Sequence, residues 1–474
     1  MAAIPSGVHR WRILLTSSLV LFLLDFGFYL TIPAQTSIFE GIICAQYHAE
    51  GNCKATPVQS ELAFINGWKD TFDALPGILL SIPYGVLADR IGRKPCLLLC
   101  LIGLLLGEFW TRIVCFWPQT LSLRLVWLSG AFRVLGGGDM VTSSLVCVIV
   151  ADSFANEDQA TALFQLTSVI LVAEMLAIPL GGALMEWSSP WVAFTLGLGI
   201  FALGIPLAAF LIPETLPVPF ENSEEEEREG PEDGDKRSLK TSLSLFISST
   251  RFITQQNILL ALLLFLVSSL GRQSTSLMLQ YSSTRYNWAF SRASLFLSVR
   301  GFVTLSAFLL VMPALSRLIT KKTTLSALHK DQRLSQLSGI LLSIGLAMIA
   351  LAAIPAWYIT GLVISALGAG FFVFARSLVT QLVTPAQRST LYAAIAVMQS
   401  VGSLVAGPLL ASLFRAGLTM GRDKMGLPFL VAGALVFVGV GAVSVIRVKD
   451  APVVCPGDGE DGDYGERQAL LGSA

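Results

Sequence analysis

Long apolar segments recur along the chain at short intervals, and they limit its possible folds more than any other feature. A helix needs roughly 20 apolar residues to cross the hydrocarbon core of a bilayer. Twelve such segments occur, at 13–33, 62–88, 95–117, 120–150, 162–186, 190–212, 257–280, 292–318, 335–355, 358–383, 389–415 and 427–447. Runs this long leave no room for alternating barrel strands. We therefore predict an all-α polytopic membrane protein with 12 transmembrane helices.

The charge content agrees with a largely lipid environment. Only 14% of the 474 residues are charged and 54% are hydrophobic, whereas soluble domains carry about 25% charged residues. The formal net charge is zero, which gives no basis for nucleic-acid binding. The sequence thus predicts lipid as the main solvent and no nucleic-acid partner.

Lysine and arginine fall unevenly on the two sides of these spans. An even number of spans puts both termini on one side, and that side holds 19 Lys and Arg against seven opposite. The seven are Lys54, Arg124, Arg285, Arg292, Arg415, Arg422 and Lys424. The positive-inside rule then predicts cytosolic termini. We expect the plasma membrane; the tail stretch 466–471 resembles an acidic dileucine sorting signal, so the vacuolar membrane is the alternative.

An acidic, Pro/Gly-rich segment divides the chain in two. Residues 213–250 contain too few apolar side chains to fold, which predicts a disordered cytosolic linker. Residues 1–212 and 251–447 would each form a six-helix bundle, followed by a cytosolic tail at 448–474. The bundles look like copies, because "GGGDMVTSS" followed by "AIPLGGAL" is matched by "GAGFFVFARS" followed by "AGPLLASL". Such a repeat predicts two pseudo-symmetric bundles.

The stretch "GVLADRIGRK" at 85–94 resembles the loop signature of the major facilitator superfamily. Arg133, four residues before Gly137, is similar to that family's span 4 motif, and "PET" at 213–215 to the usual end of its span 6. "FEGIICAQY" and "LPGILLSIPYG" are similar to a fungal branch that includes exporters of secondary metabolites and drugs. The resemblance implies a secondary active transporter with alternating access.

The loop signature implies a conformational latch. Its predicted members are Gly85, Asp89, Arg90, Gly92, Arg93, Lys94 and Asp152. The glycines permit close helix approach. Asp89 would accept hydrogen bonds from the N-terminus of span 11 near Arg388, whose dipole favours a carboxylate, and Arg90 or Arg93 would pair with Asp152. The latch would seal the cytosolic side; the alternative is that the charges only mark a cytosolic loop.

Ionisable residues inside the spans are costly and usually face a cavity or a partner. All three histidines lie outside the spans, so carboxylates must carry any coupled proton. Asp25 in span 1 and Glu174 in span 5 are candidates, each with a structural hydrogen bond as the alternative. The resemblance implies a proton-coupling role for Arg133, which would favour the ionised form of a nearby carboxylate.

Three arginines in the second half, Arg272, Arg300 and Arg376, are candidates for the substrate cavity. They would neutralise an anionic substrate or pair with carboxylates of the first half. Lys69 and Asp73 stand four residues apart, a spacing that predicts an internal pair on one helix face.

Other functions compete with efflux. Import of a small nutrient fits the same fold. "FD" at 72–73, "GGGD" at 136–139 and "PAL" at 313–315 resemble motifs of intramembrane aspartyl proteases, in which Asp73 and Asp139 would share a proton. A sensor that does not transport is the third alternative.

Two cysteines, Cys44 and Cys53, share the first external loop, where an oxidising compartment favours a disulfide. The spacing of the other cysteines resembles no metal site, and no nucleotide-binding motif occurs. The sequence therefore predicts a monomeric, non-enzymatic carrier without cofactor or metal. It would use protons to export a small, partly apolar organic molecule.

Overall fold

The computed structural model describes residues 7–47, 52–154, 156–214, 256–312, 314–315, 327–383 and 388–446, and the elements there are all helical. The first half contains α1 (Gly7–Gln46), α2 (Thr56–Ile91), α3 (Arg93–Phe116), η1 (Leu123–Leu128), α4 (Ser129–Arg133), α5 (Gly138–Ser153), α6 (Asn156–Trp187) and α7 (Pro190–Leu211). The second half contains α9 (Gln256–Tyr286), α10 (Phe290–Ser306), η3 (Ala307–Val311), α12 (Ala327–Leu351), α13 (Pro355–Leu367), η4 (Gly368–Gly370), α14 (Phe371–Gln381), α15 (Arg388–Met420), η6 (Arg422–Lys424) and α16 (Leu427–Val445).

Each of the twelve expected spans overlaps one of these helical segments or a run of consecutive ones, which is consistent with the predicted count. Within the described residues, ten segments are long and apolar enough to cross a bilayer, and α2, bent by 57° at the step from Ser81 to Pro83, makes an eleventh. The remaining expected span is α9, in which only Gln256–Gly271 is a continuous apolar stretch. The second half of α9 is polar, and it is buried between other helices. There the side chains of Gln280, Ser283 and Thr284 make hydrogen bonds.

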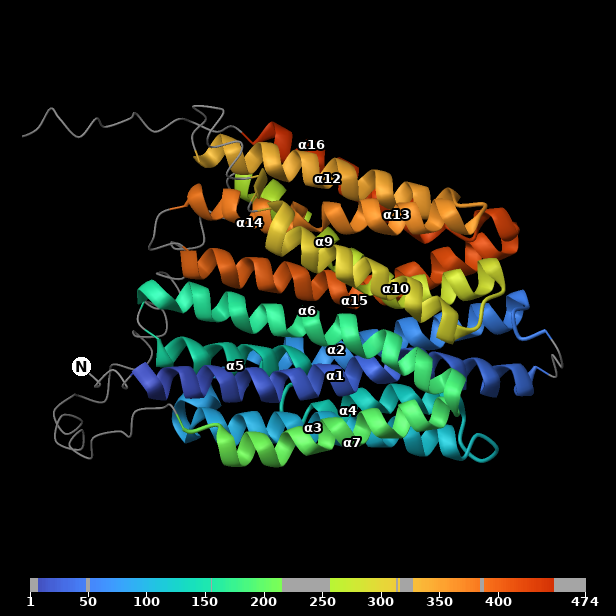
Figure 1. Cartoon of the computed structure of the whole chain (residues 1–474), viewed down its shortest axis with the longest axis horizontal. Coiled ribbons are helices and arrows are strands. Elements are labelled where there is room, and N and C mark those ends of the chain that lie inside the picture. Colours follow the sequence, from blue (N-terminus) through green and yellow to red (C-terminus); the bar gives the residue numbers. More distant parts are fainter. Residues whose placement is uncertain are drawn as a thin grey trace, which may run out of the picture.

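The helices form two bundles that lie side by side (Figure 1). In the first bundle α1 packs against α6 and α7, while α3 packs against α4, α5 and α7. In the second, α12 packs against α13, α14 and α16, and α9 packs against α15 and α16. Two helix pairs, α2 with α15 and α6 with α10, supply most of the contact between the bundles.

The fourth span of each bundle is broken at its glycines. The first break separates α4 from α5, where Gly137 and Gly138 have φ values of 79° and 72°. The second separates α13 from α14 at η4, Gly368–Gly370. The glycine-rich positions that repeat in the sequence are therefore also breaks that repeat in the structure.

The two ends of the helices differ. We call the end with the α1–α2, α3–η1, α6–α7, α9–α10, α12–α13 and α15–α16 connections the disulfide end, and the opposite end, with Gly7, Leu211 and Val445, the linker end. Four helices begin at the disulfide end with a proline in the first turn, where its missing N–H costs nothing; these prolines are Pro57, Pro190, Pro355 and Pro428. The tail predicted at 448–474 and the predicted linker, apart from Pro213 and Glu214, lie outside the described residues.

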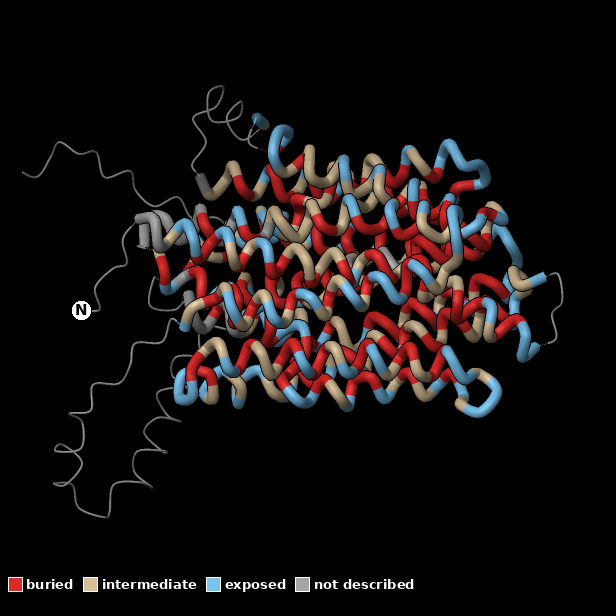
Figure 2. The backbone as a smooth tube through the Cα atoms, turned by 60° about the horizontal axis from the view of Figure 1, so that its bottom comes forward, coloured by how far each residue is buried: buried red, intermediate tan, exposed pale blue. Residues whose placement is uncertain are grey.

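The flanks of the bundles are apolar, as expected for contact with lipid. Figure 2 shows exposed and buried residues alternating along most of the helices. Large exposed side chains include Phe210, Phe302 and Phe437. Helices approach closely where glycines meet, for example at Gly27 of α1, where an added Cβ would lie 2.7 Å from the carbonyl oxygen of Gly197 in α7. Small residues at helix contacts are typical of membrane bundles.

Candidate functional site: an ion network and the faces between two bundles

Arg133, the last residue of α4, is the centre of a buried ion network. Its Nη2 lies 3.1 Å from Oδ2 of Asp73 and 3.3 Å from Oε1 of Glu108, and its Nη1 lies 2.6 Å from Oδ2 of Asp139. The planar guanidinium suits this role because it presents several donors in fixed directions. One side chain therefore connects α2, α3 and α5.

Two pairs spaced four residues apart complete this ion network. Lys69 binds Asp73 at 2.6 Å on α2, as the spacing predicted, and Arg112 binds Glu108 at 2.9 Å on α3. The guanidinium of Arg112 also donates to the carbonyl of Phe194 in α7. Three cations then face three carboxylates, those of Asp73, Glu108 and Asp139. This balance allows burial, since an unpaired charge would cost several kcal/mol.

Asp139 connects the ion network to the space between the bundles. Its side chain is 62% exposed although it lies in the middle of a span, whereas that of Arg133 is 3% exposed. Asp25 of α1 interacts electrostatically with Asp139 and with Glu174 of α6, and its Oδ2 is buried without a hydrogen-bond partner among the described residues. The charges of Asp139 and Glu174 therefore both act on the sequence-predicted Asp25.

Arg300 supplies a positive charge from the second bundle. It lies in α10, which packs against α6, and its charge acts on Glu174. Arg376 in α14 is exposed, stands 5.7 Å from the ring of Phe265 and donates to Oε1 of Gln399 at 3.3 Å. Arg272 lies in α9, but its side chain is outside the described residues. Two of the three predicted cavity arginines thus have described side chains, and one of these acts on a carboxylate of the first bundle.

The aspartates of the protease alternative do not face each other as a dyad. Asp73 accepts from Lys69, Ser129 and Arg133, and Asp139 binds the other terminal nitrogen of Arg133. A guanidinium therefore stands between the two carboxylates where a shared proton would be needed. The third motif begins at residue 313, outside the described residues.

At the linker end, part of the predicted latch is assembled. Arg93 forms an ion pair with Asp152 at the end of α5. Glu214 accepts hydrogen bonds from the backbone N–H groups of Arg93 and Lys94, at 3.0 and 3.1 Å. A carboxylate here satisfies free donors and the positive end of the α3 dipole. These contacts lie within the first bundle and do not join it to the second.

The other predicted latch residues make no contact with the second bundle within the described part of the chain. Asp89 is exposed and has no hydrogen bond or ion pair within the described part of the chain, and Arg90 is also exposed. A Cβ added at Gly85 would meet no atom within 4 Å. Residues 384–387 and the side chains at 388–390 lie outside the description, so the contact between Asp89 and the start of α15 stays a prediction.

At the disulfide end, polar side chains join the bundles. Cys44 and Cys53 form a disulfide with their Cα atoms 5.1 Å apart. Lys54, next to it, binds Glu40 and Ser283, each at 2.7 Å. Gln59 accepts from Gln280 at 3.0 Å and from Thr284 at 2.9 Å. We call this set, which consists of Glu40, Lys54, Gln59, Gln280, Ser283 and Thr284, the outer polar gate.

Within the described residues, the hydrogen bonds that join the two bundles indicate which end of the protein is closed. Most belong to the outer polar gate, and Thr71 adds one from its hydroxyl to the carbonyl of Leu404 at 3.1 Å. The remaining one, from Ser400 to the sulfur of Met140, lies near the middle of the spans. The bundles are thus joined from the middle to the disulfide end.

Comparison with known proteins agrees with this architecture. Residues 14–407 match the model of the Major Facilitator Superfamily. The chain is 36% identical to the MFS-type transporter avaK of Aspergillus versicolor, with 93% of each chain covered. It is 34% identical to the efflux pump ustT of Aspergillus flavus, covering 94% of this chain and 92% of that one.

Solved structures share the fold at low identity. The human organic anion transporter MFSD10 superposes with a TM-score of 0.60 at 19% identity, covering 92% of this chain and 99% of that one. A D-xylose–proton symporter superposes with a TM-score of 0.64 at 14% identity, covering 93% and 97%. These likenesses concern the arrangement of the helices.

Proposed function

Because this chain belongs to the major facilitator superfamily, we propose that it is a secondary active transporter that exports a small, partly apolar organic molecule in exchange for protons. The direction is supported by relatives that are themselves named efflux pumps, ustT at 34% identity and atnC of Emericella nidulans at 32%. The distribution of Lys and Arg supports a cytosolic linker end. In that orientation the described conformation is closed to the outside.

The proposal that protons are coupled to transport rests on three carboxylates, those of Asp25, Asp139 and Glu174, and on two arginines that act on them. Carboxylates that act on one another form a site at which a proton can bind and be released. Arg133 holds Asp139 from within the first bundle, and Arg300 acts on Glu174 from the second. A movement between the bundles changes the second interaction and leaves the first intact, which links proton binding to conformation.

The substrate site belongs to the same space. Arg376 is exposed beside Phe265 and Gln399, a combination of one positive charge, one aromatic face and one amide. We infer a substrate with an apolar body and an acidic or hydrogen-bonding group. We propose a monomer as the working unit. The plasma membrane is the proposed site, and fluorescence of a tagged chain separates it from the vacuolar membrane.

Purified protein in vesicles tests the proposal. Vesicles are made acidic inside and incubated with a panel of fluorescent apolar acids and bases. Antiport predicts that a substrate accumulates as protons leave, and Asp25→Asn reduces accumulation to simple equilibration. Asp423→Asn, which changes a 95% exposed carboxylate at the disulfide end, is the matched control. Accumulation that ignores the pH gradient in the unmodified protein would contradict proton coupling.

A further inference from the structure

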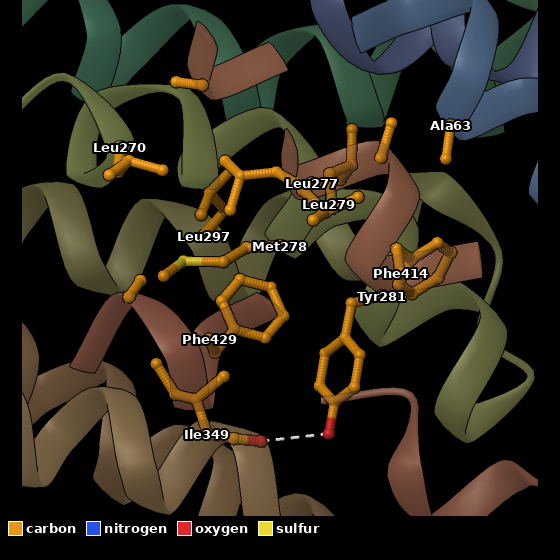
Figure 3. Close-up of a cluster of buried hydrophobic side chains, with 14 of the residues drawn as sticks. Ala63, Leu270, Leu277, Met278, Leu279, Tyr281, Leu297, Ile349, Phe414 and Phe429 are labelled. Carbon is orange, nitrogen blue, oxygen red and sulfur yellow. Dashed lines mark hydrogen bonds between the residues drawn. The ribbon is translucent and has the colours of Figure 1, made fainter. Parts of the chain in front are cut away.

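A small polar cavity lies between the bundles, under the outer polar gate. Its volume is about 30 Å³, and α2, α9 and α15 line it with Asn66, Asp70, Gln273, Gln280 and Gly407, among others. A space of that size holds about one water molecule. Figure 3 shows a cluster of buried apolar side chains that includes Ala63 of α2 and Leu277 of α9, and both of these residues also line the cavity.

Asp70 has no counter-charge to pair with in this cavity. It makes no hydrogen bond or ion pair within the described residues, and the cations of the ion network are matched by Asp73, Glu108 and Asp139. The charges that act on Asp70 are those of Lys69 and Asp73 on its own helix and of Arg133 on α4. The lining residues that α9 and α15 contribute to the cavity carry no charge.

Two glutamines in the cavity direct most of their amide donors elsewhere. The amide nitrogen of Gln280 donates to the carbonyl and the side chain of Gln59, at 2.8 and 3.0 Å. That of Gln273 donates to the carbonyl of Ser403 at 3.0 Å, and its Oε1 is buried without a hydrogen-bond partner among the described residues. A buried acceptor of this kind requires a donor. A protonated Asp70 can supply one, directly or through a water molecule.

The cavity adjoins a close contact between the bundles. Gly67 and Gly407 meet backbone to backbone there, since a Cβ at Gly67 would lie 2.6 Å from the carbonyl oxygen of Gly407. When α2 and α15 separate at this point, Asp70 is exposed to water from the disulfide end. When they close, its carboxyl group faces uncharged residues of α9 and α15 and has no ion-pair partner among the described residues, so its charged form is costly.

We propose that Asp70 is a proton-binding site of the outer half, and that its protonation accompanies closure of the α2–α15 contact. This inference deepens the proposed proton exchange and rests on it for its role in transport. It places a second protonation site at the disulfide end, apart from the group around Asp25. Closing would capture a proton and opening would release one, so an acidic outer medium favours the closed disulfide end.

Distance measurements between spin labels test this inference without a transport assay. The labels replace Gln119 in the first bundle and Lys424 in the second, both exposed at the disulfide end, in a chain lacking Cys147 and Cys455. We expect the unmodified protein to shift toward the longer distance as pH rises. Asp70→Asn should lose this shift and stay closed, Asp70→Glu should retain it, and Asp423→Asn is the matched control.

The outcomes separate this inference from the proposed function. A pH-dependent shift that persists in Asp70→Asn, or that requires Na⁺ at constant pH, overturns the assignment of the proton to Asp70. No shift in the unmodified protein also overturns it, even where transport follows the pH gradient. A shift lost in Asp70→Asn in a protein whose transport ignores the gradient supports the site and rejects proton exchange.

Discussion

Arg133 binds Asp139 at 2.6 Å, although its own side chain is 3% exposed and that of Asp139 is 62% exposed. The pair therefore joins a buried ion network to the space between the bundles. A change of charge at Asp139 is transmitted through one guanidinium to Asp73 and Glu108, and so to α2 and α3.

Arg133→Ala should destabilise the protein strongly, whereas Arg133→Lys should mainly reduce transport. Removal of the guanidinium leaves Lys69 and Arg112 to balance three carboxylates, those of Asp73, Glu108 and Asp139. Breaking a buried ion network in this way costs about 3–5 kcal/mol. Lysine keeps the charge but cannot bind Asp73, Glu108 and Asp139 with fixed geometry. Thermal unfolding in detergent and gradient-driven uptake measure the two effects. Asp139→Asn is the companion variant, and it should also lose uptake. Its loss of stability should be much smaller than that of Arg133→Ala, because Asp139 is exposed.

Gly407→Ala should hold the disulfide end open. Its new Cβ would overlap the carbonyl oxygen of Gly67, and overpacking of this kind costs about 1–3 kcal/mol. The cost falls on the closed arrangement alone, so the spin-label distance across the disulfide end should lengthen. Gly199→Ala is the matched control, because a Cβ there meets no atom within 4 Å. Equal distances in both variants would exclude the Gly67–Gly407 contact as the closing point.

Loss of the Cys44–Cys53 disulfide should loosen the outer polar gate. The bond closes a short loop next to Lys54, and Gln59 donates to the carbonyl of Cys53 at 2.9 Å. Its removal should cost about 2–3 kcal/mol of stability and raise the fraction open at the disulfide end. Reductant added to the unmodified protein should give the same distances as a variant in which both cysteines are replaced by serine. It should not alter the distances in that variant. An unaltered distance distribution after full reduction would show that the gate closes without the disulfide.

Asp89→Asn should favour the conformation described here. Asp89 is exposed in it and makes no contact among the described residues, so the variant loses nothing there. If Asp89 binds the start of α15 in the opposite conformation, only that conformation is weakened. A cysteine in place of Gln399, in a chain without Cys147 and Cys455, should then react several-fold faster with an impermeant maleimide added at the linker end. If the charges merely mark a cytosolic loop, the rate will not change.

Much of the fold could be predicted from hydropathy and local pattern. The sequence pattern predicts spans 4 and 10 and the glycines within them. The spacing of Lys69 and Asp73 alone predicts that they form a pair. The polar second half of α9 is the informative exception. Gln280 and Thr284 reduce its apolar character because they bind Gln59 across the bundles, so a functional contact weakens the signal of the span.

The candidate site could be predicted only in part. Asp25, Glu174 and Arg133 stand out because charges are rare inside spans. Their assembly with Asp139 and Glu108 depends on how helices pack, and spacing along the chain carries no such information. Glu214 could have been suspected from its place in "PET", but its two backbone donors belong to the first turn of α3, more than a hundred residues earlier.

The breaks at Gly137 and at Gly368–Gly370 place a pivot halfway along one helix of each bundle. A rigid helix that tilts to close one end of a transporter must open the other end. A helix with a break halfway along it can bend inward at either end independently, so both ends can be closed at once around a substrate. The carrier can therefore pass through a fully enclosed intermediate, which prevents a continuous leak across the bilayer.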